Sequence, residues 1–165
     1  PRPLRFTTGR RDAFWAHNCA AIGLSSGFLE PLESTSIHLI QSHVNRLIQL
    51  FPAQGDGAAE RAEYNRRCAA EFEQIRDFLI LHYKQTARDD SAFWNYCRTM
   101  AVPDSLAYKQ ALFASSGRIG RDIDDLFREA SWVQVMLGQG VTPQAHDPMA
   151  DALSDAQLGE FLGNV

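Results

Sequence analysis

Two carboxylates and three hydroxyl side chains fall within the segment Glu-Pro-Leu-Glu-Ser-Thr-Ser at positions 30–36. An amphipathic stretch follows from about Ile37, and Ser and Thr are residue types that begin helices by accepting hydrogen bonds from free amides of the first turn. Such a terminus presents unpaired N–H groups and the positive end of the helix dipole, so it can bind an anion. Glu33 lies within one turn of it, where a carboxylate can take up a proton. The segment therefore predicts an anion site beside a proton acceptor.

The elements that must position this segment are mostly helices. Apolar residues recur at intervals of three and four along much of the chain, which is the period of an amphipathic helix. The predicted helices cover residues 35–51, 58–84, 91–97, 103–114, 123–130 and 155–162, and residues 131–137 could be strand or helix. Short strands are expected at residues 4–8 and 18–24, with a turn at residues 9–12 between them. The expected fold class is mainly α, with short N-terminal strands.

The two longest predicted helices each carry their apolar residues in a stripe. In the first helix the stripe is Ile37, Ile40, Val44, Leu47, Ile48 and Phe51, and in the second it is Tyr64, Cys68, Phe72, Ile75, Leu79 and His82. His38 and His43 are five positions apart on the first helix, which separates them on its surface. They are therefore interpreted as surface or packing histidines and not as ligands of a metal.

Composition limits the classes of function. A chain of 165 residues with net charge -4 and no stripe of Lys or Arg is not typical of a nucleic-acid-binding protein. The three cysteines form no CxxC pair, which argues against a metal cluster and favours a reducing, cytoplasmic setting. No apolar stretch reaches the roughly 18 residues of a membrane span. A soluble cytoplasmic enzyme that does not bind membranes is the expectation, and a homodimer is left open.

The segment also resembles a known one. Residues 22–37, IGLSSGFLEPLESTSI, are similar to the GFxEPLES-T motif of the flavin-dependent tryptophan halogenases. The flanking GRR-x-x-FW-x-x-NC at residues 9–19 and the LFP at residues 50–52 fit the same family. The resemblance extends over most of the chain but is specific over about residues 9–52. It implies the C-terminal helical part of an α/β FAD-dependent monooxygenase-like fold, with residues 1–36 as the last strands and helix start of the flavin-binding core and residues 37–165 as the helical region.

The resemblance assigns roles to the residues of the motif. It implies that Glu33 is the catalytic carboxylate, that Thr35 and Ser36 bind chloride or bromide through their amides, and that Leu24 and Ile37 touch the flavin. The cofactor would be FAD, delivered in reduced form by a separate flavin reductase. With O2 and halide it would give a hypohalous species that reaches an electron-rich aromatic ring near Glu33. Ser34, Phe93, Trp94 and Trp132 are the candidates for contact with this substrate, although aromatic residues at helical spacing belong to a core more often than to a pocket.

Several features depart from the tryptophan-specific enzymes. Ser36 stands where these enzymes commonly carry glycine, and residues 122–140 contain no tyrosine pair. Another indole, a phenol or a tethered aromatic is therefore as plausible a substrate as free tryptophan. The Gly-x-Gly-x-x-Gly turn, the Trp-x-Trp-x-Ile-Pro signature and the family's N-terminal lysine are also missing from the sequence. We therefore expect this chain alone to bind FAD weakly or not at all, to show no halogenase activity and to self-associate.

Two other functions remain open from the sequence. A flavin-dependent aromatic hydroxylase would keep the fold but would have no need of a halide site. A non-catalytic helical interaction module would explain the missing nucleotide-binding residues. For Glu30, which precedes Pro31, a structural role in the turn is expected, because a residue before proline is held in extended conformation.

Overall fold

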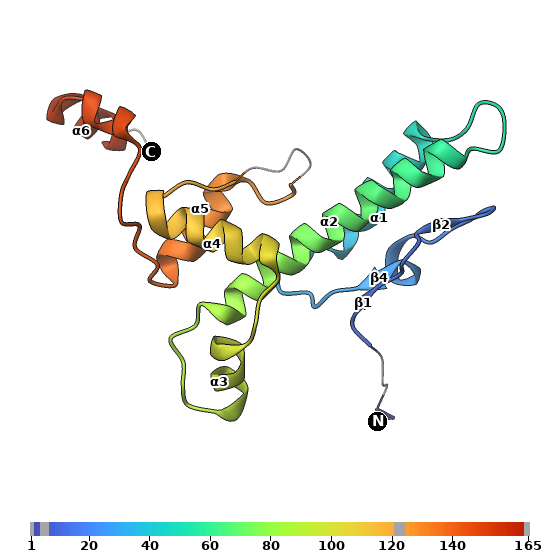
Figure 1. The fold of residues 1–165 in the computed structure, drawn as a ribbon, viewed down its shortest axis with the longest axis horizontal. Coiled ribbons are helices and arrows are strands. Elements are labelled where there is room, and N and C mark those ends of the chain that lie inside the picture. The colour runs from blue at the N-terminus through green and yellow to red at the C-terminus, as the bar shows by residue number, and fades with distance from the viewer. Residues whose placement is uncertain (1, 4–6, 121–124, 164–165) are drawn as a thin grey trace. The chain divides into compact units, whose positions relative to one another are not determined.

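The computed structural model describes residues 2–3, 7–120 and 125–163 (Figure 1). Contacts within the chain divide the described residues into two compact units. The first unit contains the residues up to Leu79 together with 125–126, and the second contains the remainder from Ile80. The expected mostly helical architecture with few, short strands is confirmed. The expected division into residues 1–36 and 37–165 concerns a flavin-binding core and stays a prediction.

The first unit begins with two small antiparallel pairs of strands. Strand β1 (Gly9–Arg10) pairs with β4 (Gly27–Phe28), and β2 (Trp15–Ala16) pairs with β3 (Cys19–Ala20). Between β3 and β4 lies a short 3-10 turn, η1 (Gly23–Ser25). Gly27 allows the close approach of β4 to β1, because a Cβ at this position would lie 2.6 Å from the carbonyl oxygen of Gly9.

The sequence placed these strands incorrectly. A turn was expected at residues 9–12, but β1 occupies part of that range and the chain reverses around His17, whose φ is 53°. The expected strand at residues 18–24 ends after Ala20, because Gly23 adopts a φ of 67° and starts the 3-10 turn. Residues 4–6 of the other expected strand, including Leu4 and Phe6, lie outside the described residues.

Helix α1 (Ser36–Gln49) and most of helix α2 (Ala58–Lys84) belong to the first unit, and the last residues of α2, from Ile80, belong to the second. The two helices match the predicted ranges and are joined by residues 50–57. The expected capping of α1 by hydroxyl side chains is wrong. Thr35 is the N-cap residue, but its side chain makes no capping hydrogen bond, because its φ of -73° and ψ of -9° are helical whereas a capping residue is usually extended. The side chain of the N-cap residue therefore does not occupy the amides of the first turn.

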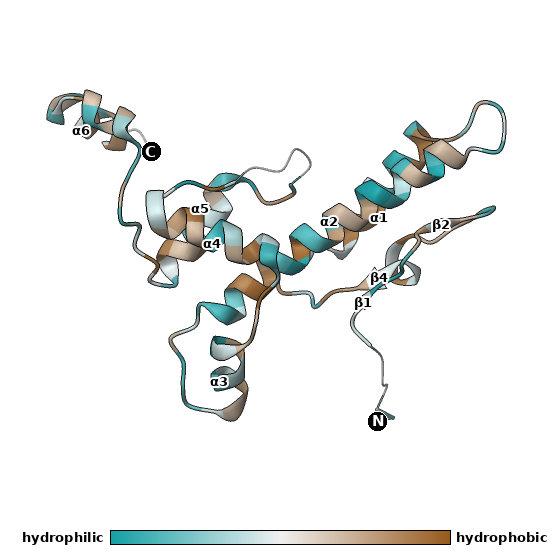
Figure 2. Cartoon of the chain, in the orientation of Figure 1, coloured by the Kyte–Doolittle hydropathy of each residue, from teal (hydrophilic) through white to brown (hydrophobic). Residues whose placement is uncertain are grey.

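The apolar stripe of α2 forms the core of the first unit. Figure 2 shows hydrophilic and hydrophobic segments alternating along this helix. Tyr64, Cys68, Phe72 and Ile75 are buried, with Phe14 and Trp15 of the N-terminal segment packed among them. The aromatic pair at residues 14 and 15 therefore anchors the strand turn, through hydrogen bonds from both amides to the side chain of Asn65.

The second unit is built from shorter helices. These are α3 (Ala92–Thr99), α4 (Asp104–Ser116), α5 (Glu129–Gly138), the 3-10 helix η2 (Pro148–Ala152) and α6 (Asp155–Gly163). Ser91 caps α3 as predicted, with its Oγ accepting from the amide of Trp94 at 3.3 Å. Gly117 ends α4 in the left-handed conformation, with a φ of 70°. Leu106, Phe113, Trp132 and Met136 form the buried core of this unit.

One helix boundary in the second unit differs from the prediction. A helix was expected at residues 123–130, but α5 begins only at Glu129, and residues 121–124 lie outside the described residues. Residues 131–137, which could have been strand, belong to α5. Within the described ranges, no helix combines the length and the apolar character needed to cross a bilayer.

Candidate functional site

The segment at residues 30–36 makes a tight turn between β4 and α1. The carboxylate of Glu30 accepts a hydrogen bond from the amide of Leu32 at 2.6 Å, and the amide of Ser34 donates to the carbonyl of Pro31 at 2.9 Å. The φ of Ser34 is 54°, in the left-handed region that few residues other than glycine adopt. The turn thus reverses the chain into the helix, and the expected structural role of Glu30 is confirmed.

A cavity of about 30 Å³ lies at the start of α1. One wall comes from the turn around η1 and the other from the first residues of the helix, and the lining residues are Gly23, Leu24, Gly27, Leu29, Thr35, Ser36, Leu39 and Ile40. A space of this size corresponds to roughly one water molecule or one small ion. The first turn of α1 contains no acidic residue, so no carboxylate there opposes an anion. Three predicted site residues, Leu24, Thr35 and Ser36, thus line one cavity.

The other predicted residues of the motif lie on the exposed side of this helix start. Glu33 and Ser34 are exposed in the turn, ahead of the helix. Leu24 is 77% exposed and Ile37 is 69% exposed, which is unusual for large apolar side chains. An apolar surface therefore lies beside the cavity, next to an exposed carboxylate.

This apolar surface continues along α1. The stripe expected on this helix does lie on one side, but it is exposed: Ile40 is 42%, Val44 39% and Ile48 70% exposed. We call Ile37, Ile40, Val44 and Ile48 the outward face of α1. The residues that α1 buries in the first unit are instead Leu39 and His43.

The aromatic candidates for substrate contact belong to the second unit. The ring of Trp94 stacks on Tyr83 with centroids 6.1 Å apart, and the guanidinium of Arg88 lies 4.5 Å from its centroid. Phe93 packs edge-on against the same two rings and is 56% exposed. These aromatic rings therefore form a partly exposed cluster on and beside α3.

Trp132 is core and does not line a pocket. Its side chain is fully buried, and its indole N–H donates to the carbonyl of Phe127 at 3.2 Å. The ammonium of Lys109, itself 5% exposed, lies 4.7 Å from the centroid of the ring. The packing alternative for this residue is the one that the structure supports.

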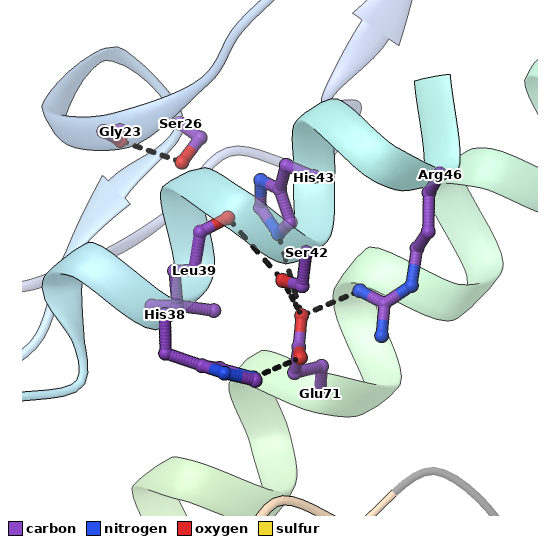
Figure 3. A network of polar contacts seen from close by, with 8 residues as sticks. All are labelled: Gly23, Ser26, His38, Leu39, Ser42, His43, Arg46 and Glu71. Carbon is purple, nitrogen blue, oxygen red and sulfur yellow. Dashed lines mark hydrogen bonds and ion pairs between the residues drawn. The ribbon is translucent and has the colours of Figure 1, made fainter. Parts of the chain in front are cut away.

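A buried polar cluster joins α1 to α2, and the sequence did not predict it (Figure 3). We call it the Glu71 cluster; it consists of Glu71 on α2 and His38, Ser42, His43 and Arg46 on α1. The carboxylate of Glu71 is 2% exposed and accepts from His38 Nε2 at 2.8 Å, Ser42 Oγ at 2.8 Å and Arg46 Nη1 at 2.5 Å. His43 Nε2 lies 3.7 Å from the same carboxylate. The interpretation of His43 as a packing histidine is correct, whereas His38 holds a buried carboxylate.

The electrostatics of this cluster follow from burial and from the arginine. Burial would raise the pKa of Glu71, but the hydrogen bond and the charge of Arg46, with the hydrogen bonds from Ser42 and His38, lower it overall. Glu71 is therefore ionised at neutral pH. For His43, burial lowers the pKa to about 4, so its ring is uncharged at neutral pH. The result is one buried ion pair beside a neutral imidazole.

Two signals in the sequence could have identified the cluster. Glu71 lies at helical spacing from Tyr64, Cys68 and Ile75, so an acidic residue falls within the buried stripe of α2. His38, Ser42 and Arg46 follow one another at intervals of four, which places three donors in one row of α1. Among the described residues, no group of three or more His, Cys, Asp or Glu side chains is arranged to hold a metal ion.

The fold is shared with solved halogenases. Xcc4156, a flavin-dependent halogenase from Xanthomonas campestris, is 53% identical with a TM-score of 0.92, over 99% of this chain and 33% of that chain. BrvH, a flavin-dependent halogenase from Brevundimonas sp. BAL3, is 47% identical with a TM-score of 0.89, over 99% of this chain and 33% of BrvH. The chain therefore spans about a third of the length of these solved relatives.

Comparisons of sequence give the same result. The tryptophan 6-halogenase SttH of Streptomyces toxytricini is 46% identical over 104 residues, which are 63% of this chain and 20% of SttH. A family model described as tryptophan halogenase matches residues 1–155, nearly the whole chain. The chain belongs to the tryptophan halogenase family.

Proposed function

We propose that the protein containing this chain is a flavin-dependent halogenase that replaces a hydrogen of an electron-rich aromatic ring with chlorine or bromine. The observation that carries this proposal is the cavity of about 30 Å³ at the start of α1, lined by Thr35 and Ser36. A carboxylate, Glu33, lies less than one turn ahead of it. A hydroxylase of the same fold would have no use for an ion-sized cavity in this place.

Thr35 and Ser36 are the proposed halide ligands. The first amides of a helix have no partner within it, and the helix dipole places positive charge at this end. The side chain of Thr35 leaves these amides uncapped, and no acidic residue in the first turn competes with an anion. Ser36 in place of the family's common glycine does not alter the amide donor, and the cavity remains large enough for one ion. Chloride and bromide both fit this chemistry.

Leu24 and Ile37 are the proposed flavin contacts. Both are large apolar side chains that are mostly exposed, and they lie on either side of the residues proposed to bind halide. A planar, largely apolar ring system placed against them would remove this surface from water. The residues therefore fit the ring end of FAD. Reduced FAD, delivered by a separate flavin reductase, would activate O2, which is the two-electron oxidant that turns halide into an electrophile.

Glu33 is the proposed proton acceptor. When the aromatic carbon forms its bond to halogen, the C–H bond at the same carbon must break and its proton must leave. A carboxylate held at the helix start can take that proton, which is general base catalysis. Ser34 beside it is the proposed contact of the aromatic substrate. Tryptophan, another indole or a phenol all have the electron-rich ring that this reaction needs.

The test is an assay of the full-length gene product with FAD, a flavin reductase, NADH, O2 and either chloride or bromide. A panel of free tryptophan, other indoles, phenols and peptide-tethered indoles is analysed by mass spectrometry. A product with the isotope pattern of chlorine or bromine that requires the added halide supports the proposal. A hydroxylated product whose yield is independent of halide would instead show an aromatic hydroxylase.

A further inference from the structure

The Glu71 cluster connects α2 to the beginning of the helix that carries the proposed halide site. Its donors His38, Ser42 and Arg46 follow one another at intervals of four along α1. The first of them is only two residues beyond Ser36, about 3 Å along the helix axis at the usual rise per residue. The polar contacts of Glu71 therefore reach the turn of α1 that contains the cavity residues.

The cavity is sensitive to the position of α1, because its walls come from two different elements. Gly23, Leu24 and Gly27 belong to the turn around η1, and Thr35, Ser36, Leu39 and Ile40 belong to the helix or its N-cap. The two walls are close together, since a Cβ on Gly23 would lie 3.2 Å from Cγ1 of Ile40. A small rotation or axial shift of α1 would therefore change a space of about 30 Å³ considerably.

Apolar packing alone does not fix that rotation. On the side of α1 that faces the core, His43 packs on three aromatic rings. The distances between ring centroids are 5.3 Å to Phe14, 6.0 Å to Phe72 and 6.2 Å to Tyr64. Its two ring nitrogens are buried without a hydrogen-bond partner, so this residue contributes shape but no directional bond. Hydrogen bonds constrain distance and angle, whereas apolar contact is non-directional. On the core-facing side of α1, three hydrogen bonds to α2 converge on Glu71.

We propose that Glu71 is a positioning residue for the halide site: through His38, Ser42 and Arg46 it sets the rotation and axial position of α1, and so the size of the cavity lined by Thr35 and Ser36. This inference rests on the proposed function. Glu71 does not touch the cavity, since it is absent from its lining residues. Its effect on halide binding must therefore be transmitted by the helix.

The test uses Glu71→Gln in the full-length gene product. Glutamine keeps the shape of the side chain but removes the charge that Arg46 pairs with, so α1 loses its strongest directional contact. The KM for chloride should rise about 10-fold while kcat at saturating chloride changes less than about 2-fold, the pattern of weakened ground-state binding. Hydrogen exchange at the amides of residues 35–37 should become faster.

Two further variants separate positioning from folding. Ser42→Ala removes one oxygen from the same cluster without removing a charge, and it should raise the KM for chloride about 3-fold even if Glu71→Gln folds poorly. Glu73→Gln is the matched control on α2; its carboxylate is half exposed and pairs with Arg10 away from α1, so the KM should not change.

The outcomes distinguish this inference from the proposed function. If Glu71→Gln and Ser42→Ala only lower the melting temperature, with an unchanged KM for chloride and unchanged exchange at residues 35–37, Glu71 is not a positioning residue. If the parent protein makes no halogenated product, the proposed function fails. The exchange measurement, which needs no turnover, then still decides whether Glu71 controls the start of α1.

Discussion

The two faces of α1 differ from those of a typical surface helix. The face toward α2 buries Leu39 and His43 but also carries His38, Ser42 and Arg46, arranged around the buried carboxylate of Glu71. The outward face is apolar and exposed, with Ile48 at 70% exposure. A surface helix usually buries its apolar side and exposes its polar side. The helix that carries the proposed halide site is therefore held by polar contacts on one side and offers an apolar surface on the other.

The difference teaches how one short helix can serve two purposes. The buried ion pair with Glu71 gives α1 a defined orientation, which apolar packing alone would specify less sharply. The outward face remains available for another surface, and the residues proposed to touch the flavin, Leu24 and Ile37, adjoin it. Xcc4156 has the same fold within a chain about three times as long.

The largest expected effect on stability comes from removing the buried ion pair between Glu71 and Arg46. Glu71→Leu leaves Arg46, which is 12% exposed, without its counter-ion, and breaking a buried pair costs about 3–5 kcal/mol. Urea denaturation of the chain, followed by circular dichroism, measures this loss. The double variant Glu71→Leu with Arg46→Leu should recover most of it, because no buried charge is left unpaired. A loss below about 1 kcal/mol in the single variant would show that apolar contacts hold α1.

The next effect concerns the exposed end of the same helix. Glu33→Gln in the full-length gene product should lower halogenation about 100-fold or more if the carboxylate takes the proton, while flavin binding is unchanged. Product formation is measured by mass spectrometry and flavin binding by fluorescence quenching. Glu30→Gln is the matched control, because an amide oxygen can still accept the hydrogen bond from Leu32. Parent-like turnover in Glu33→Gln would leave this residue without a catalytic role.

The sequence predicted the helices well because their signals are local. The range of α2 was predicted to the residue, and Ser91 and Ser154 cap α3 and α6 as expected. The strands were placed incorrectly, because pairs of two residues carry too little alternation to be recognised and depend on distant partners such as Gly9 and Phe28. The start of α5 was predicted too early: residues 125–128 lie outside the helix, although Leu126 and Phe127 fit the helical period.

The site could be predicted only where the motif carried it. Leu24, Thr35 and Ser36 line one cavity, whereas the roles that the resemblance gives them stay predictions. The Glu71 cluster was missed because Arg46 and Glu71 read as surface charges on two amphipathic helices. Whether such charges meet depends on the packing of α1 against α2, which the periodicity of either helix alone does not determine.

A smaller effect on the free energy of unfolding is expected from the neutral imidazole of His43, on the side of α1 that faces the core. Because the pKa of His43 is lowered from 6.5 to about 4 in the fold, the unfolded chain takes up this proton first as the pH falls. The free energy of unfolding is therefore highest above pH 6.5 and decreases toward pH 4. The decrease between pH 7 and pH 5 is about 2 kcal/mol. The stabilisation from Glu71, whose pKa is also lowered, is present above its ordinary pKa of 4.5 and is lost only as the pH falls below that value.

Urea denaturation at pH 7 and pH 5 measures this dependence. His43→Leu should flatten it and should change stability at pH 7 by no more than about 1 kcal/mol, because the two ring nitrogens that it removes have no hydrogen-bond partner. His17→Asn is the control, since His17 is exposed and asparagine tolerates its positive φ. An unchanged pH dependence in His43→Leu would mean that another group titrates with folding.

The smallest effect on stability, and the most direct test of the outward face, is expected from Ile48→Glu. Its side chain is 70% exposed, so the substitution should change the free energy of unfolding by less than about 0.5 kcal/mol. In the chain alone, a charge on this face should shift self-association toward monomer, because exposed apolar patches drive association and a charge would be buried by it. Sedimentation velocity measures the shift. Leu162→Glu, on a residue of α6 that is 63% exposed, should have a weaker effect. Equal effects of the two variants would show that association does not depend on the outward face of α1.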